Sequence, residues 1–249
     1  DVEVEEGWLG PLAELMASDE RIAALAPKIL SYDRPGYFEY AGASGGFLDA
    51  FGYPFCRGRI LDTIEQDDGQ YDTSRDVFWA SGACMMVRAD VFRKLGGFDG
   101  DFFAHMEEID FCWRAQLAGY RIMVEPRSWV FHLGGGTLPN NSPRKLYLNY
   151  RNNLSMLYKN LSKRTLWPLL FTRMVLDGMS AFVFLMQGRR DFFKVVFRSH
   201  MDFYKILGML RAKRRAIQRD RTGSAAGNIY RGSIILRHAL GRRTFGRMM

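Results

Sequence analysis

The sequence has 249 residues, of which 47% are hydrophobic and 14% aromatic, so it can fold around a sizeable core and is not an intrinsically disordered chain. Its three cysteines are widely spaced and odd in number. This pattern excludes a disulfide scaffold and a cysteine zinc site, and it suits a reducing compartment.

The formal net charge of +8 is unevenly distributed along the chain. Residues 1–140 contain 12 Lys and Arg against 23 Asp and Glu, a net charge of −11. Residues 141–249 contain 23 Lys and Arg against 4 Asp and Glu, a net charge of +19. We therefore expect two parts with different tasks, the second facing the phosphate groups of lipid or nucleic acid. The start, "DVEVEEGWLG", does not have the pattern of a signal peptide.

The first part of the chain alternates between helical and extended patterns. Apolar residues recur at helical spacing over 8–16, and residues 22–30 are predicted to form a strand. Residues 31–76 are rich in Gly, Asp and aromatic residues with little periodicity. We expect them to form a long, folded excursion, because loops of this length in compact domains are usually functional.

The next elements continue this alternation. A strand is predicted over 77–87, followed by a short helix at 89–95, and further strands are predicted at 121–124 and 129–132. Strands that alternate with helices predict the α/β class.

The stretch "GGFDGDFFAHMEEIDFCWR", from Gly96 to Arg114, is dense in glycine, aromatic and acidic residues. Gly96 and Gly97 are expected to end the preceding helix, because glycine tolerates a left-handed C-cap. The aromatic residues that follow are expected to pin the loop to the core, and these are Phe98, Phe102 and Phe103.

A helix is predicted over 106–119, with Gly119 closing it. At 100° per residue, Asp110 and Arg114 form an i,i+4 pair on the face that also carries Glu107. The predicted buried stripe consists of Ile109, Trp113 and Leu117. Glu108 falls between these faces, beside small residues that leave room for a ligand. Acids in a first turn can simply complement the helix dipole, or one of them can act as a general base.

These residues resemble the inverting family 2 glycosyltransferases with the GT-A fold, in particular bacterial rhamnosyltransferase-like and galactofuranosyltransferase-like members. The resemblance runs from "SGACMMVRADVF" through the stretch above to "PRSWVFHLGGGT", and continues weakly into "YLNYRNNLSML". It is strong over residues 77–137, about a quarter of the chain. In the family, an acidic pair with a third acid two residues on, then an Arg, opens the catalytic helix, and a histidine follows.

The resemblance implies a role for each matching position. Glu108 occupies the position of the catalytic base, where many members have Asp. Glu107 and Asp110 would shape the acceptor site and hold the base, with Arg114 as their structural partner. The other positions expected at the acceptor site are Trp79, Gly82, Ala83, Asp99 and Trp113.

The resemblance also implies a donor site with a divalent metal, Mg or Mn. His132 matches a histidine that helps to bind the metal or the donor diphosphate, although a satisfied structural role is an equal alternative. Asp1 matches the final aspartate of the family's nucleotide-binding motif. The chain is then expected to lack the nucleotide-binding half and to hold the acceptor part and the base.

The basic part contains two different patterns. Residues 165–188 are the most apolar, but Arg173 and Asp177 interrupt them, so the uninterrupted run falls short of the ~20 residues that span a bilayer. Residues 189–221 interleave aromatic residues with Lys and Arg. This favours an anionic membrane surface; plain packing on the catalytic domain and nucleic-acid binding are the alternatives. We expect the basic tail, 222–249, to be mobile.

Together these features predict three segments: the acceptor and catalytic part of a GT-A domain (1–145), a basic amphipathic helical region (146–221) and the tail. The predicted function is inverting transfer of a sugar from a nucleotide-sugar donor to a glycan acceptor. The acceptor is expected to be lipid-linked and the glycan a cell-surface polysaccharide. We expect a peripheral protein on the cytoplasmic face of the membrane that does not bind nucleic acid. The alternative function is a non-catalytic, membrane-docked sugar-binding or scaffold module.

Overall fold

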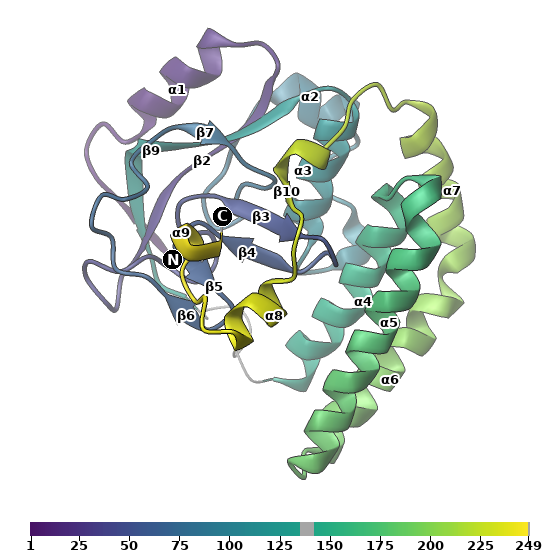
Figure 1. Ribbon diagram of the computed structural model, residues 1–249. Coiled ribbons are helices and arrows are strands. Elements are labelled where there is room, and N and C mark those ends of the chain that lie inside the picture. The colour runs from purple at the N-terminus through teal and green to yellow at the C-terminus, as the bar shows by residue number, and fades with distance from the viewer. Residues whose placement is uncertain (135–141, 249) are drawn as a thin grey trace.

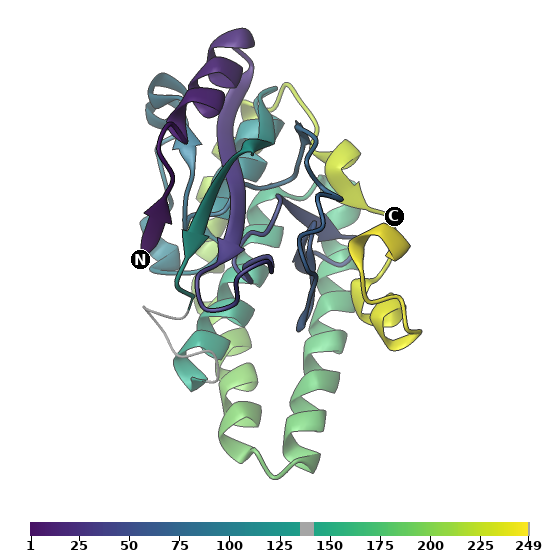
Figure 2. The same cartoon turned by 90° about the vertical axis from the view of Figure 1, so that its left-hand side faces the viewer.

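A computed structural model of the chain describes residues 1–134 and 142–248. Two β-sheets lie beside one another, and long helices pack along one side of them (Figure 1). Turned by 90°, the molecule shows two of these helices projecting well beyond the sheets as a hairpin (Figure 2). The α/β class predicted from the sequence is confirmed.

The larger sheet is built around two parallel strands, β2 (Ile22–Ser31) and β9 (Arg121–His132). The first eight residues of β2 are all buried, as expected for a parallel strand that is covered on both faces. Three short strands pair antiparallel with them: β1 (Val2–Val4) and β7 (Arg75–Asp76) with β9, and β8 (Met86–Val87) with β2. The resulting order is β1-β9-β2-β8.

Strand β9 combines the two strands that were predicted at 121–124 and 129–132. Its pairing with β2 shifts register after Pro27, whose partner is Glu125, and resumes between Lys28 and Trp129. Proline has no N–H to donate to a ladder, so an irregularity at this point is expected. The separate-strand prediction was wrong because one continuous strand can carry a bulge.

Helices cover the larger sheet. Helix α1 (Leu9–Ser18) packs on it through Leu12, which confirms the helix predicted over 8–16. Helix α2 (Ala89–Lys94) confirms the helix predicted at 89–95 and is followed by the 3-10 turn η1 (Gly100–Phe102) and by α3 (Glu107–Leu117). The glycines predicted to end these helices do so with positive φ, which is +77° at Gly96, +67° at Gly97 and +91° at Gly119.

The strand predicted over 77–87 is wrong for most of its length. Only Met86–Val87 forms a strand, β8. The N–H groups of Phe78 and Trp79 both donate to the carbonyl oxygen of Gly46, and the N–H of Cys84 donates to Ser81. The segment therefore leaves the larger sheet at Val77, whose N–H donates to Ile122 of β9, contacts the smaller sheet, and turns before it returns to the larger one.

Residues 31–76 do form a folded excursion, which supplies most of the smaller sheet. The strands of the smaller sheet follow the order β10-β3-β4-β5-β6. They are β10 (Ile229–Tyr230), which comes from the tail, and β3 (Gly46–Asp49), β4 (Pro54–Cys56), β5 (Arg59–Ile60) and β6 (Thr63–Ile64).

The tail was expected to be mobile, and this is wrong. Strand β10 pairs in parallel with β3, and the segment continues through α8 (Ile234–Ala239) to α9 (Phe245–Met248). The short turn η2 (Ala226–Asn228) precedes it. The Phe245 ring is buried among Phe47, Phe55 and Tyr71. Apolar anchors spaced along a basic sequence therefore hold the tail against the smaller sheet.

The basic region forms the long helices α4 (Pro143–Asn160), α5 (Lys163–Met186), α6 (Arg190–Lys205) and α7 (Leu207–Arg219). Ser142 and Ser162 cap the first two helices by accepting N–H bonds from Lys145 and Thr165. By length and composition alone, α5 is long and apolar enough to cross a membrane. Arg173 and Asp177 interrupt the apolar run, as the sequence indicated, and both lie on the buried side of the helix.

Candidate active site

The acidic helix α3 begins after an unusual left-handed turn. Phe103, His105 and Met106 all have positive φ, at 66°, 67° and 76°, although none of them is glycine. Such backbone is strained, and it persists only where the surroundings hold it in place. Asn152 of α4 supplies this hold: its Nδ2 lies 2.9 Å from the oxygen of Phe102, 2.8 Å from Ala104 and 2.9 Å from His105.

The aromatic residues expected to pin this loop behave differently from one another. Phe102 is buried, and Phe98 packs edge-on against Phe111 while remaining partly exposed. Phe103 is 69% exposed, so the prediction that it is anchored in the core is wrong. The reversed backbone at this residue turns its side chain outward, where Arg144 stacks over the ring.

The Glu108 side chain is half-buried beside a cavity, and its Oε2 has no hydrogen-bond partner among the described residues. Desolvation, followed by the charge of Glu107, raises its pKa to about 7. Gly82 lies behind it, because a Cβ at this glycine would be 3.7 Å from the Cβ of Glu108. Burial also raises the pKa of Glu107. A carboxyl group with a pKa near neutrality can accept a proton at physiological pH.

Asp110 lies away from the cavity and is completely buried in an ionic network. Its Oδ2 accepts from Arg114 Nε at 2.8 Å and from Lys159 Nζ at 2.9 Å, and its Oδ1 accepts from Asn160 at 2.8 Å. The predicted pairing of Asp110 with Arg114 is confirmed. Arg114 also donates to the carbonyl oxygens of Leu95 and Gly97, which fixes α3 to the loop before it.

Asp99 belongs to the same network, because Lys159 donates to it at 2.6 Å and Lys213 of α7 at 2.5 Å. These cations, acting against burial, hold the pKa of Asp99 at about 2. Asp99 and Asp110 are therefore occupied in joining α3 to α4 and α7. The resemblance implied that Asp99 lies at the acceptor site and that Asp110 shapes this site and holds the base. The geometry gives both residues a structural role instead.

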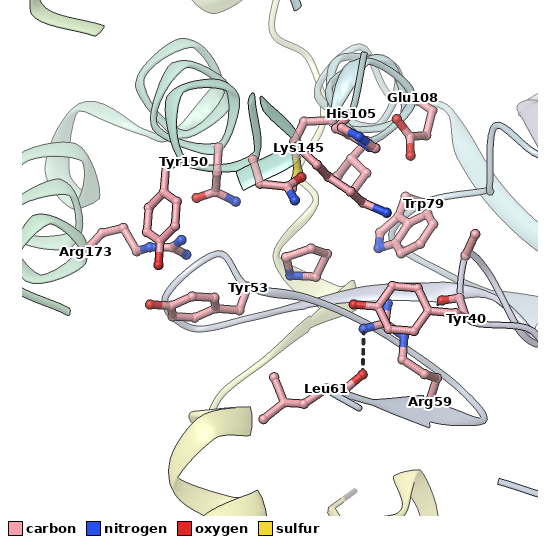
Figure 3. Close-up of a pocket in the computed structure, with 16 residues that line it drawn as sticks. Tyr40, Tyr53, Arg59, Leu61, Trp79, His105, Glu108, Lys145, Tyr150 and Arg173 are labelled. Atoms are coloured by element: carbon pink, nitrogen blue, oxygen red, sulfur yellow. Dashed lines mark hydrogen bonds between the residues drawn. The ribbon is translucent and has the colours of Figure 1, made fainter. Parts of the chain in front are cut away.

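The cavity next to Glu108 has a volume of about 370 Å³ and lies between α3, α4, α5 and the smaller sheet. Figure 3 shows Glu108 and Trp79 at one end, and Tyr53, Tyr150 and Arg173 at the other. The lining is mostly apolar and aromatic, with a few polar groups, which is the usual character of a small-molecule site. Its residues are Tyr40, Ala41, Tyr53, Pro54, Arg59, Leu61, Trp79, His105, Met106, Glu108, Ile109, Lys145, Asn149, Tyr150, Asn153 and Arg173.

The other expected acceptor residues divide between this cavity and other places. Trp79 lines the cavity, and its Nε1 donates to the carbonyl oxygen of Phe47 at 3.0 Å. Trp113 is buried against Phe78 and lines a separate cavity. Ala83 lies in the turn with its N–H donated to Ser81 and does not line the Glu108 cavity.

Two polar residues at the cavity were not predicted from the sequence. His105 Nε2 and Asn153 Oδ1 are buried at its wall, and neither has a hydrogen-bond partner within the described ranges. Burial and the charge of Lys145 lower the pKa of His105, which favours the neutral ring. Buried polar atoms are usually satisfied in folded proteins, so water or a polar ligand in the cavity would be the partner of these two atoms. Tyr40 and Tyr53 also line the cavity, and the abundance of aromatic residues in 31–76 was the only feature of the sequence that indicated this.

Asp1 and His132 lie side by side at the end of the larger sheet. Their Oδ2 and Nε2 atoms are 3.6 Å apart, and His132 Nδ1 is 3.3 Å from Oε2 of the buried Glu39. The N–H of Ala41 donates to this Glu39 carboxylate, and Ala41 lines the cavity. The Asp1–His132 pair therefore lies next to the Glu108 cavity. The "LGGGT" stretch that follows His132 in the sequence lies mostly outside the described residues, which stop at Gly134 and resume at Ser142.

The described residues include no group of three or more His, Cys, Asp or Glu side chains placed to hold a metal ion. Asp1 and His132 nevertheless fit the metal that the resemblance implies. Mg²⁺ is commonly held by one or two carboxylates together with substrate phosphates, so a complete protein cage is not required.

Comparison with known proteins gives a consistent result. The profile of the family described as "Glycosyl transferase family group 2" matches residues 4–187. N-acetylglucosaminyl-diphospho-decaprenol L-rhamnosyltransferase of Mycobacterium tuberculosis is 29% identical over 135 residues, which cover 53% of this chain and 44% of that protein. Rhamnosyltransferase WbbL of Escherichia coli is 39% identical over 85 residues, covering 34% of this chain and 31% of that protein.

A solved structure, that of GalNAc-T7 with UDP, GalNAc and Mn²⁺, covers 64% of this chain and 30% of that chain, with 15% identity. Its TM-score of 0.44 is too low for the likeness to carry an argument. The chain spans less than half the length of the two curated relatives it matches above.

Proposed function

The chain belongs to glycosyl transferase family group 2, and on that premise we propose that it transfers a sugar from a nucleotide-sugar donor to a saccharide hydroxyl with inversion. One observation carries the proposal. The Glu108 carboxyl group borders an aromatic-lined cavity, its Oε2 has no hydrogen-bond partner among the described residues, and its pKa is about 7. A base in this state can take the proton of an acceptor hydroxyl.

The reaction is a single displacement. The acceptor hydroxyl oxygen attacks the anomeric carbon on the face opposite the departing nucleoside diphosphate, while Glu108 accepts the hydroxyl proton. The bond from the anomeric carbon to the diphosphate oxygen breaks with its electron pair, and the configuration at that carbon inverts. One base suffices for this chemistry, in contrast to the paired carboxylates of glycosidases.

Asp1 and His132 would hold the divalent metal and the donor diphosphate at the edge of the site. When bound, Mg²⁺ or Mn²⁺ offsets negative charge on the leaving diphosphate. Glu39 Oε2 lies 3.3 Å from His132 Nδ1 without a hydrogen bond between them, and it would orient the imidazole ring once a metal is bound, as carboxylates next to metal-ligating histidines commonly do.

The acceptor in this proposal is a saccharide held by aromatic rings and by the unsatisfied polar atoms of His105 and Asn153. The names of the Mycobacterium and Escherichia relatives describe rhamnosyltransferases, and the first name includes a diphospho-decaprenol acceptor. By analogy we propose a lipid-linked acceptor, a role in cell-surface glycan synthesis and a place at the cytoplasmic face of the membrane.

The test is sugar transfer by the full-length protein, with nucleotide-linked L-rhamnose as donor and a diphospholipid-linked N-acetylglucosamine as acceptor. Glu108→Gln is expected to lower the rate by at least ~100-fold, because general-base catalysis contributes about that much. Glu108→Asp should retain part of the activity. Glu14→Gln, on the exposed face of α1, is the matched control.

Two outcomes would contradict the proposal. If Glu108→Gln transfers sugar as fast as the unaltered protein, Glu108 is not the base. If neither protein transfers sugar but both bind the acceptor equally, the alternative of a sugar-binding module replaces the transferase.

A further inference from the structure

Helix α5 exposes a continuous apolar stripe along its outer face. The stripe residues are spaced three or four apart and are between 47% and 73% exposed; they are Trp167, Phe171, Val175, Met179, Phe182 and Met186. At 1.5 Å per residue the stripe is about 29 Å long. The opposite face packs on the protein through Leu166, Leu170, Arg173, Asp177 and Ala181. Contiguous exposed apolar surface of this extent usually marks an interaction site.

Helix α6 adds a second apolar stripe, formed by Phe193, Phe197, Met201 and Tyr204. The Tyr204 hydroxyl lies 3.2 Å from the sulfur of Met174, so this stripe is on the flank of α6 that borders α5. On either side of the turn between α5 and α6, the rings of Phe184 and Phe192 are 5.3 Å apart. The two stripes therefore form one surface, which we call the hairpin surface.

Cations border the hairpin surface. The exposed cations of α6 are Arg190, Lys194, Arg198 and Lys205. At the tip, the Arg189 guanidinium stacks 3.5 Å from the centre of the Phe192 ring. The acids of α5 and α6 are Asp177, Asp191 and Asp202. Asp177 is buried and Asp202 is paired with Lys205, so Asp191 is the exposed one that offsets the cations. An apolar surface edged by positive charge is complementary to an anionic lipid bilayer.

We propose that the hairpin surface lies in the interfacial layer of a bilayer containing anionic lipid, with α5 parallel to the membrane plane. The relevance of this surface to a lipid-linked acceptor rests on the proposed function, whereas the membrane contact itself does not. The stripe residues enter the acyl boundary, and the cations of α6 reach the headgroups.

The buried face of α5 explains why the helix lies on the membrane and does not cross it. Arg173 donates to Asp177 at 3.0 Å, and its guanidinium stacks 3.5 Å from the centre of the Tyr53 ring of the smaller sheet. Crossing the bilayer would either carry this ion pair into hydrocarbon or separate it from the sheet, and both are costly. Arg173 and Tyr53 also line the Glu108 cavity, so docking α5 places one cavity wall at the lipid surface.

The experiment measures cosedimentation of the full-length protein with vesicles. We expect binding to vesicles of phosphatidylglycerol mixed with phosphatidylcholine, and weaker binding to phosphatidylcholine alone or at high salt. The variant Phe171→Asp/Phe182→Asp should bind at least about tenfold more weakly, because it loses two aromatic side chains that would be buried in the bilayer. Brominated lipid should quench the fluorescence of the unaltered protein more than that of Trp167→Phe.

A matched control uses exposed apolar residues away from the hairpin. Leu236 and Leu240 of α8 are 60% and 70% exposed, and Leu236→Asp/Leu240→Asp should bind vesicles as the unaltered protein does. Circular dichroism and thermal unfolding of each variant establish that it is folded.

Several results would overturn the proposal. The first is that the protein does not cosediment with anionic vesicles. The second is that the Phe171→Asp/Phe182→Asp variant binds vesicles as strongly as the unaltered protein. The third is that Leu236→Asp/Leu240→Asp loses as much binding as that variant. A lipid-free dimer that Phe171→Asp/Phe182→Asp abolishes would assign the surface to a second copy of the chain. Sugar transfer to a water-soluble acceptor analogue serves as the independent measurement: if it persists without vesicle binding, only the membrane inference fails.

Discussion

At the scale of single residues, the three acids at the start of α3 differ because their neighbours differ. Asp110 is surrounded by the cations of Arg114 and Lys159 and therefore stays ionised inside the protein. Glu108, four residues from Cys112 and next to Glu107, has no such cation within the described part of the chain, and its pKa rises to about 7. The same type of side chain thus serves as structural anion or as base according to its surroundings.

The raised pKa of Glu108 predicts opposite effects of pH on activity and on stability. Transfer needs the ionised carboxylate, so its rate should rise with pH through a midpoint near 7. Because the folded-state pKa lies above the ordinary value of 4.5, the contribution of Glu108 to stability is lost as pH rises between these values. Glu108→Gln should therefore be more stable than the unaltered protein above pH 7, by about 1–3 kcal/mol.

Urea unfolding of the two proteins across this pH range measures the effect. The two stabilities should converge as the pH falls below 4.5, where Glu108 is protonated in both the folded and the unfolded states. A difference that stays constant with pH would show that the substitution acts through packing and not through ionisation.

At the scale of elements, α4 fixes the position of α3 by holding the strained turn that precedes α3. Asn152 is completely buried and binds three carbonyl oxygens of this turn, while its own Oδ1 accepts from Arg151. The left-handed backbone at His105 and Met106 would relax without these bonds. The base is therefore presented by a turn that a different helix holds.

Asn152→Ala is expected to destabilise the protein by about 1–3 kcal/mol, because buried carbonyl oxygens lose their donor. Relaxation of the turn should also admit water to Glu108 and lower the pH midpoint of transfer toward the ordinary glutamate range. Ser155→Ala is the control on the same helix, since the Ser155 hydroxyl bonds only to Arg151 within α4 among the described residues. An unchanged midpoint in a destabilised Asn152→Ala protein would limit Asn152 to a structural role.

Local patterns in the sequence were sufficient to predict α3, its pairing of Asp110 with Arg114, and the glycines that end each helix. They were not sufficient where distant parts of the chain decide the outcome. Asp99 was assigned to the acceptor site, but Lys213, which pairs with it, is 114 residues away. Residues 77–87 bond to both sheets, and the tail pairs with the smaller sheet, whose short strands carry no periodicity that a sequence pattern reveals.

At the scale of the whole molecule, the cavity beside Glu108 forms where the smaller sheet and the long helices meet. The smaller sheet supplies Tyr53 and Arg59, α3 supplies Glu108, and α5 supplies Arg173. The tail then covers the outer side of the smaller sheet by inserting Phe245 into its aromatic cluster. The shape of the cavity thus depends on contacts made far from the base.

Phe245→Ala is expected to lower the free energy of unfolding by about 3–5 kcal/mol, the usual cost of removing a buried phenylalanine ring. Leu240→Ala, at a residue that is 70% exposed on the same tail, should change it by less than about 0.5 kcal/mol. Thermal or chemical unfolding measures both. Equal, small effects would mean that the tail does not stabilise the smaller sheet.

The parallel pairing of β10 with β3 also sets an order of events during synthesis. Strands β3 to β6 leave the ribosome early, but the neighbour of β3 is made only after the long helices α4 to α7 are complete. Until then the nascent chain exposes an unpaired strand edge and the aromatic cluster that Phe245 later covers. The nascent chain therefore exposes surfaces of the kind that chaperones bind, and the smaller sheet is complete only once the tail has docked.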